Sequence, residues 1–356
     1  MWTTTAITKK IGIKFPIIQA PMAGGATTPE LVAAVSNAGG LGSLGAGYMA
    51  AQEIRTAIIR IRELTDKPFS VNLFIPEKYH ATLTQINQMC HWIEQSCPEL
   101  NTKINPVIAP YAPEFDNQMS VILEEKVPVF SFTFGILNGN WIEKLKNKGV
   151  FLIGTATTLT EARLLLEHQI DAVVAQGSES GGHRGTFIGK TEDALFGVET
   201  LVRHLLENVK IPVIAAGGIM DAKGIVSALA LGAEAVQMGT AFLNCHESGI
   251  NSSYKDALLS AMQDNTILTR VFSGKMARGL KNKFIERMQH YQDDILDYPI
   301  QNALTRSMRK EAEKQGNVDF MSMWAGQSVY LSKACSAAEL IKKLTNDVNV
   351  LLKKIK

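Results

Sequence analysis

Residues 171–185 read Asp171-Ala172-Val173-Val174-Ala175-Gln176-Gly177-Ser178-Glu179-Ser180-Gly181-Gly182-His183-Arg184-Gly185. The first five residues form an apolar run, which is typical of a buried parallel strand. The strand ends in a loop with four glycines and one histidine. Glycine lets a backbone approach a ligand closely, and the histidine pKa lies near neutrality. Two interpretations follow: a loop that holds a flat or phosphorylated ligand beside a proton acceptor, or a tight turn with a solvent-exposed histidine.

Seven further apolar runs resemble this strand, and helix-like segments separate them. The runs lie at residues 15–20, 41–44, 69–74, 127–132, 150–156, 211–216 and 235–238. Eight alternating units predict a parallel sheet that closes into a (β/α)8 TIM barrel. The rival fold is an open doubly wound sheet. Its GxGxxG fingerprint is missing after the first strand, where Pro21-Met22-Ala23-Gly24-Gly25 stands instead, so we favour the barrel.

Three helices carry starting signals. Thr28 and Pro29 predict the N-cap and first residue of a helix that ends at Gly39. Thr160 is the expected cap of a helix over 161–168, and Asp221 the cap of a helix over 222–231. The last 20 residues, 337–356, predict a closing amphipathic helix.

Two segments exceed the simple barrel pattern. Residues 77–126 are long for one crossover, and we interpret them as an insertion that decorates the barrel. Residues 244–309 predict several helices and no strand, which form a cap over the mouth of the barrel. The expected domains are therefore a barrel at 1–243 and 316–356, and a helical substrate-binding cap at 244–315. The stretches 273–279 and 324–327 are expected near the same mouth.

Composition excludes several classes of function. Of 356 residues, 46% are hydrophobic and 20% charged, and the formal net charge of +2 comes without the basic cluster that nucleic acid requires. The four cysteines include no CxxC pair, and the seven histidines are scattered, so no metal site is expected. No signal peptide and no apolar run of about 18 residues is present, so we expect no membrane span and a cytoplasmic protein.

Function in such barrels lies at the carboxyl ends of the strands. After the seventh and eighth strands stand Gly217-Gly218 and Gly239-Thr240. Loops at these two strands commonly bind phosphate through backbone N–H groups. The alternative is that these glycines only form sharp turns. Two matched loops at the expected strands favour the phosphate site.

A phosphate site beside amide side chains indicates a flavin mononucleotide, FMN. Asn72 and Gln176 follow their strands and are candidates to bind the polar edge of the flavin ring. The segment Pro21-Met22-Ala23 is the candidate for an apolar wall against the ring face. Each signal is weak by itself, because buried Asn and Gln often only satisfy backbone groups.

The chain resembles the FMN-dependent nitronate monooxygenases of class I, once called 2-nitropropane dioxygenases. The phrases PIIQAPMAGG, VNLF, AQGSESGGHRG, IPVIAAGGI and QMGTAFL carry the resemblance, which extends from about residue 15 to 324, and the GGHRG loop is its most specific element. The resemblance implies a TIM barrel with a helical substrate domain. It implies His183 as the catalytic residue. The implied FMN-binding residues are Pro21, Met22, Ala23, Asn72, Gln176, Gly181, Gly182, Gly217, Gly218, Gln237, Met238, Gly239 and Thr240.

The reaction that the resemblance implies is oxidation of an alkyl nitronate. FMN accepts electrons from the nitronate, O2 then reacts, and a carbonyl compound and nitrite are formed. A neutral nitroalkane must first lose its α-proton, which a neutral His183 accepts. For Arg184 we favour a structural ion pair over an anchor for the nitronate. Glu179 is a candidate to orient His183 or to pair with Arg184.

Three other functions stay open at this stage. The first is an FMN-dependent enoyl-acyl-carrier-protein reductase that uses NADH or NADPH and has a similar glycine-glycine-histidine loop. The second is a non-catalytic protein that binds a flavin or a phosphorylated sugar. A metal-dependent hydrolase is poorly supported. The physiological substrate, whether propionate 3-nitronate, another nitronate or an unrelated compound, and the oligomeric state are not defined by the sequence.

Overall fold

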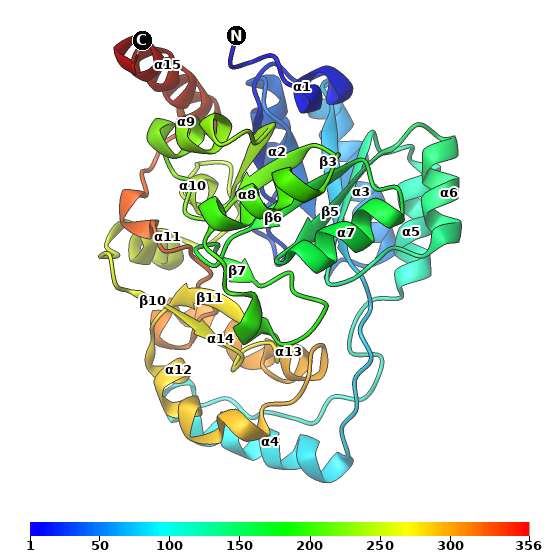
Figure 1. Ribbon diagram of the computed structural model, residues 1–356. Coiled ribbons are helices and arrows are strands. Elements are labelled where there is room, and N and C mark those ends of the chain that lie inside the picture. The colour runs from blue at the N-terminus through cyan, green and yellow to red at the C-terminus, as the bar shows by residue number, and fades with distance from the viewer. Residues whose placement is uncertain (356) are drawn as a thin grey trace.

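The apolar runs of the sequence form a closed parallel barrel. In the computed structural model, which describes residues 1–355, eight parallel strands alternate with helices (Figure 1). The strands are β1 (Ile17–Gln19), β2 (Gly42–Gly45), β3 (Phe69–Phe74), β4 (Val129–Thr133), β5 (Phe151–Ala156), β6 (Ala172–Gln176), β8 (Val213–Ala216) and β9 (Ala235–Met238). Their spatial order is β1-β9-β8-β6-β5-β4-β3-β2. The Gln19 N–H donates to Leu41 O and the Leu41 N–H to Ile17 O, both at 2.9 Å, which closes the ring. The expected (β/α)8 TIM barrel is confirmed.

Helices cover the outside of this barrel and its amino-terminal end, where Ile7 and Ile11 join the apolar cluster inside the barrel. They are α1 (Ala6–Ile11), α2 (Pro29–Asn37), α3 (Ala51–Leu64), α5 (Phe115–Glu124), α6 (Gly139–Asn147), α7 (Leu159–Glu167), α8 (Val198–Asn208), α9 (Ala222–Ala230), α10 (Thr240–Leu243) and α15 (Ala337–Ile355). Helix α15 packs against α9 and α2, so it joins the last and first units of the barrel. Both chain ends lie at the same end of the molecule (Figure 1). Lys356, the last residue of the expected closing helix, lies outside the described residues.

The helix starts agree with two of three expected caps. Thr28 accepts a hydrogen bond from the Leu31 N–H, with Pro29 as the first residue of α2. Asp221 accepts from two N–H groups at the start of α9. The expectation for α7 is wrong, since Thr158 is the cap and not Thr160. Thr158 and Glu161 form a reciprocal capping box. The helix therefore begins at Leu159 and not at Glu161, as a cap at Thr160 would require.

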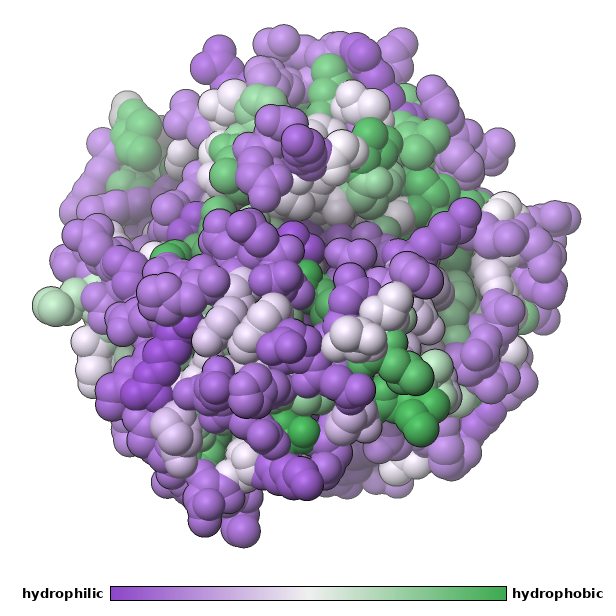
Figure 2. Space-filling model, turned by 90° about the horizontal axis from the view of Figure 1, so that it is seen from below, coloured by the Kyte–Doolittle hydropathy of each residue, from purple (hydrophilic) through white to green (hydrophobic). Residues whose placement is uncertain are grey.

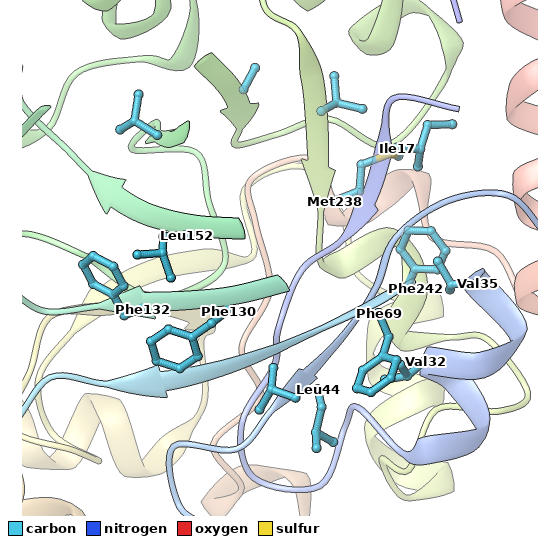
Figure 3. Packing of buried hydrophobic residues seen from close by; sticks show 14 of the residues in the cluster. Ile17, Val32, Val35, Leu44, Phe69, Phe130, Phe132, Leu152, Met238 and Phe242 are labelled. Atoms are coloured by element: carbon cyan, nitrogen blue, oxygen red, sulfur yellow. The ribbon is translucent and has the colours of Figure 1, made fainter. Parts of the chain in front are cut away.

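Two apolar layers stabilise the barrel. Side chains that point into the barrel include those of Ile18, Val129, Ile153, Val174 and Ile214. The outer layer lies between strands and helices, and Figure 3 shows part of it. There Phe130 and Leu152 come from strands, while Val32 and Val35 come from α2. All four are fully buried, so the strands are covered on both faces, as continuous apolar runs require.

A second body covers the carboxyl ends of the strands, and we call it the cap. It comprises α4 (Leu83–Ser96), α11 (Ser252–Leu259), α12 (Lys283–Met288), α13 (Ile300–Leu304), α14 (Arg306–Gln315) and the strands β10 (Thr266–Thr269) and β11 (Ala277–Leu280). The cap has its own apolar cluster, which includes Met89, Phe272 and Phe284. Short 3-10 turns at Pro98–Leu100, Thr191–Ala194, Gln289–Asp294, Val318–Phe320 and Val329–Leu331 complete the elements.

The prediction that residues 244–309 contain no strand is wrong. Strands β10 and β11 pair antiparallel, and β11 also pairs with β7 (Gly182–His183), so three strands form a small sheet. In this pairing His183 lies opposite Ala277 and Gly182 opposite Arg278. The strands have only two to four residues, too few for a clear period-2 pattern, and β7 lies far from β11 in the sequence.

The long crossover at residues 77–126 divides between the two bodies. Helix α5 packs on α3 and α6 at the barrel surface, as expected for a decoration of the barrel. For α4 that expectation is wrong, because α4 packs on α12 at the far end of the cap (Figure 1). Its buried side chains, such as Met89 and Ile93, belong to the apolar cluster of the cap. The domain boundaries at residues 243 and 316 stay a prediction.

The surface at the cap end is largely hydrophilic, with hydrophobic side chains in small groups (Figure 2). Among residues 1–355, no helix combines the length and the apolar character needed to cross a bilayer.

We predict that Phe284→Ala destabilises the protein by about 3–5 kcal/mol, because it opens a cavity in the cap cluster. The Phe284 side chain is fully buried, and its ring lies 4.9 Å from that of Phe272. Urea unfolding measures the change. Ile59→Ala, at a residue 48% exposed, is the control and should change stability by at most about 0.5 kcal/mol. Equal effects of the two substitutions would contradict the buried cap cluster.

Candidate active site

A cavity of about 340 Å³ lies where the barrel mouth meets the cap. Its walls come from the ends of the barrel strands, the loop after β6 and the cap elements. The expected catalytic and FMN-binding residues all line it: Pro21, Met22, Ala23, Asn72, Gln176, Gly181, Gly182, His183, Gly217, Gly218, Gln237, Met238, Gly239 and Thr240. The structure thus brings these residues together in one place, while their individual roles stay predictions.

One end of the cavity offers unused backbone donors. The N–H groups of Gly217, Gly218, Gly239 and Thr240 donate to no backbone oxygen within residues 1–355. Thr240 is buried and the three glycines are half-buried, and N–H groups withheld from water are normally paired, so four free donors at adjoining strand ends fit an anionic ligand. The φ angles of 137° at Gly217 and 66° at Gly218 place both in the region that favours glycine.

The glycine loop passes close to the cap. A Cβ at Gly181 would lie 2.5 Å from the Gly326 nitrogen, so only glycine fits this crossing. The Gly326 N–H donates to Thr240 Oγ1 at 3.0 Å, and the Gln327 N–H donates to Glu179 O at 3.0 Å. Residues 324–327 therefore return to the barrel mouth, as expected.

Gln176 holds the loop that carries His183. Its Nε2 donates to His183 O at 3.0 Å, and its Oε1 accepts from the Gly185 N–H at 2.8 Å. The amide keeps a second N–H and a second lone pair for a ligand in the cavity. Asn72 is 3% exposed, and its Nδ2 donates to Ser131 Oγ at 2.9 Å. Its Oδ1 accepts no hydrogen bond in the described part of the chain.

His183 lies at the junction of barrel and cap. It follows barrel strand β6 and belongs to β7, which pairs with cap strand β11. Its Nε2 forms a 2.8 Å hydrogen bond with Ser273 Oγ, and this hydroxyl donates to Lys275 O at 3.1 Å. Aromatic rings surround the imidazole with centroids 5.3 to 6.5 Å away, and they belong to Phe74, Phe134, Tyr298 and Trp324.

This environment keeps His183 neutral. Burial, together with the Lys275 ammonium and the Arg309 guanidinium, lowers the pKa of His183 to about 3. Lys275 is itself paired with Glu77, with Nζ 2.8 Å from Oε1. A neutral imidazole retains a nitrogen lone pair that can accept a proton, but the burial and the two cations that keep it neutral also lower its basicity.

The side chains of Arg184 and Glu179 bind backbone groups, and in the described residues neither forms a hydrogen bond with the His183 side chain. The Arg184 side chain is fully buried and donates to the carbonyl oxygens of Gly177, Gln176 and Ala194. The expected ion pair is wrong, because the partners of Arg184 in the described residues are three carbonyl oxygens and not a carboxylate. Burial lowers the pKa of Arg184 to about 10. Both carboxylate oxygens of Glu179 accept from the N–H at the start of α8, at 3.0 Å.

The sequence missed several residues of the cavity wall. These are Tyr48, Phe74, Phe134, Asn302 and Arg309. The first three stand at or just after the ends of β2, β3 and β4, so the rule of strand ends could have found them. Asn302 and Arg309 come from cap helices, and no sequence signal relates those helices to the cavity.

Comparisons with known proteins agree with this geometry. The family model described as "Nitronate monooxygenase" matches residues 4–347. The chain belongs to the nitronate monooxygenase family. A "probable nitronate monooxygenase" of Staphylococcus aureus strain JH9 is 44% identical over 353 residues, which cover 99% of each chain.

Two solved structures extend the comparison. A nitroalkane oxidase from Streptomyces ansochromogenes superposes with a TM-score of 0.91 and 38% identity, covering 99% of this chain and 100% of that one. FabK from Thermotoga maritima gives a TM-score of 0.77 and 33% identity, covering 99% and 98%. Membership of the nitronate monooxygenase family makes the protein an oxidoreductase that acts on a small molecule.

We predict that His183 makes the protein less stable in acid. The unfolded histidine has its ordinary pKa of 6.5 and the folded one about 3, so between these values the unfolded state binds more protons. The free energy of unfolding should therefore fall as the pH drops from about 6.5. In His183→Gln this slope should decrease by up to about 1.4 kcal/mol per pH unit. Urea titrations at several pH values measure it, with the exposed His80→Gln as control; identical slopes for wild type and His183→Gln would refute a neutral buried imidazole.

Proposed function

We propose that this protein is an FMN-dependent nitronate monooxygenase, which oxidises alkyl nitronates with O2 to a carbonyl compound and nitrite. One observation carries the proposal: a neutral histidine faces the same cavity as four free backbone donors at the ends of β8 and β9. The histidine would accept a proton from a carbon acid, and the backbone donors would bind a phosphate. Family membership supports the same reaction.

The residues present fit FMN. The N–H groups of Gly217, Gly218, Gly239 and Thr240 would hold its phosphate. Asn72 and Gln176 would bind the polar edge of the ring, because each keeps unused hydrogen-bonding capacity toward the cavity. The segment 21–23 would lie along the ring. When bound, FMN would supply the electron acceptor for the nitronate and the site of reaction with O2.

His183 would accept the α-proton of a neutral nitroalkane. With its one hydrogen donated to Lys275 O, the Ser273 hydroxyl would accept from His183 Nε2–H. In this tautomer Nδ1 carries the lone pair that takes the proton. The Gln176 bond to His183 O and the β7–β11 pairing hold the imidazole in place. A nitronate has already lost its proton and needs no such base.

The aromatic walls would protect the reacting carbon. Phe74, Phe134 and Trp324 surround the imidazole and line the cavity, so they exclude water from the bound substrate. Exclusion of water strengthens the hydrogen bonds and charge interactions inside the cavity. Low exposure by itself disfavours an anion, so a bound nitronate would depend on these strengthened interactions with the donors and cations of the cavity.

Experiments on the same purified protein also test the reductase alternative. The similarity to FabK shows that related folds serve other proteins of this superfamily. If the bound flavin is bleached by NADH without air, and if the protein does not react with nitronates, the reductase function is favoured. A protein that only binds a flavin would have no use for His183, and His183→Gln would then change no reaction.

We predict that wild-type protein consumes O2 and releases nitrite with ethylnitronate and, more slowly, with nitroethane. His183→Gln should lower kcat/KM for nitroethane by about 100-fold or more, the usual contribution of a general base. The reaction with ethylnitronate should change far less, because no proton is removed. Nitrite release and O2 uptake are measured, with FMN content as the check on folding. Equal losses for both substrates would refute a role of His183 as the base.

We also predict that Gly218→Ala weakens FMN binding about tenfold or more, through strain at positive φ and loss of the phosphate cradle. The φ of Gly218 is 66°, and a Cβ would lie 3.3 Å from that of Glu179. Fluorescence titration of apoprotein with FMN measures Kd. Gly149→Ala is the matched control, because Gly149 also has a positive φ of 74° and a Cβ there meets nothing within 4 Å. An unchanged Kd in Gly218→Ala would place the phosphate elsewhere.

A further inference from the structure

Arg309 presents a positive charge to the cavity without an acidic partner. It lies on α14 and lines the cavity wall together with Asn302 and Tyr48. Its Nη2 donates to Asn302 O and to Asn302 Oδ1, both at 2.9 Å, and its Nε donates to Thr305 Oγ1 at 3.2 Å. All these partners are neutral. Within residues 1–355, Arg309 forms no ion pair, and its Nη1 donates no hydrogen bond.

Other charged groups near the cavity are differently placed. Lys275 is neutralised by Glu77, and Arg184 donates to three carbonyl oxygens of its own loop region. Glu313, one turn along α14, also lines the cavity and attracts the Arg309 charge, but its side chain is exposed and forms no ion pair or hydrogen bond with Arg309. Burial lowers the pKa of Arg309. A half-buried guanidinium is costly without a counter-charge, so the cavity is suited to an anion.

The position of this guanidinium is tied to that of the imidazole. Thr305, which accepts from Arg309, donates its own hydroxyl to Phe272 O at 2.5 Å. The next residue, Ser273, forms the hydrogen bond with His183 Nε2. Two adjacent residues of one cap turn therefore anchor both groups, so their separation is fixed by short and buried hydrogen bonds.

Tyr48 adds a neutral donor beside Arg309. Burial raises its pKa to about 12, while Arg309 and Arg306 act in the opposite direction. Its hydroxyl therefore keeps its proton, and it donates to none of the described residues. The Tyr48 ring packs edge-on against Phe74 at 5.4 Å, and Phe74 packs edge-on against His183 at 6.5 Å. The phenol, the guanidinium and the imidazole thus face one continuous aromatic space.

We infer that Arg309 and Tyr48 form an oxyanion-binding subsite that holds the negatively charged end of the substrate. The inference rests on the proposed function in taking a nitronate as substrate. A planar anion with two oxygens suits the guanidinium fork, with a further bond from the phenol. Two sources share this chemistry: the nitronate oxygens themselves, or a carboxylate at the other end of the substrate.

The test compares Arg309→Gln, Arg309→Lys and Tyr48→Phe with wild type on three substrates. These are ethylnitronate, the nitronate of 3-nitropropanoate, which carries a carboxylate, and neutral nitroethane. Arg309→Gln should raise KM for the bound anion by about tenfold or more, the usual effect of losing a hydrogen bond to a charged group, with kcat much less affected. Arg309→Lys should restore part of the loss, and Tyr48→Phe should cause a smaller one. The control is Arg287→Gln, on cap helix α12, where Arg287 pairs with Glu99 outside the cavity.

The two nitronates separate the two sources. Equal rises in KM for both nitronates assign the subsite to the nitronate oxygens, and a rise only for the carboxylated one assigns it to the carboxylate. Unchanged KM values for both nitronates in Arg309→Gln and Tyr48→Phe, with FMN content retained, would overturn the inference.

A binding measurement separates this inference from the proposed function. Propionate is an unreactive carboxylate, and it should raise the Tm of wild-type protein but not that of Arg309→Gln. If wild type oxidises no nitronate, the proposed function fails, while this difference would still support the subsite. The same Tm change in both proteins would overturn it.

Discussion

The short antiparallel pairing between β7 and β11 is the contact on which the site depends. It joins Gly182 and His183, which follow a barrel strand, to Ala277 and Arg278 of the cap. Other bonds also reach the loop after β6, such as Arg278 Nε to Ser178 O and the Gln327 N–H to Glu179 O, but this pairing is the one that joins the backbone of His183 to a cap strand. The close crossing of Gly181 over Gly326 depends on the same approach, since any side chain at position 181 would collide with the cap backbone.

Barrel and cap contribute different chemistry to the cavity. The barrel supplies neutral hydrogen-bonding groups. These are the free backbone N–H groups at the ends of β8 and β9, and amide side chains that hold loops. The cap supplies the groups that set the electrostatics around His183, among them Ser273, Lys275 and Arg309. This division fits an enzyme in which a common scaffold binds the cofactor and a variable body selects the substrate. Changes in the cap should therefore alter substrate preference more readily than cofactor binding.

The sequence predicted the features that depend on local pattern. Eight apolar runs with helices between them specify a barrel, and glycines at the ends of strands mark the cavity. Features that depend on distant partners were missed. Strands of two to four residues show no alternation of apolar and polar side chains, so the β7–β11 pairing could not be predicted. The sequence of α4 likewise does not indicate that its apolar face packs on α12 and not on the barrel. Arg309 was missed for the same reason, because its helix reaches the cavity only through the folding of the cap.

The central claim is that one cavity, shared by barrel and cap, holds FMN by its phosphate with His183 beside the ring. A crystal structure of the FMN-loaded protein tests this most directly. The account predicts density for the phosphate within hydrogen-bonding distance of the N–H groups of Gly218 and Thr240, and for the ring between residues 21–23 and His183. Purified protein that is colourless and takes up no FMN, or flavin density outside this cavity, would contradict it.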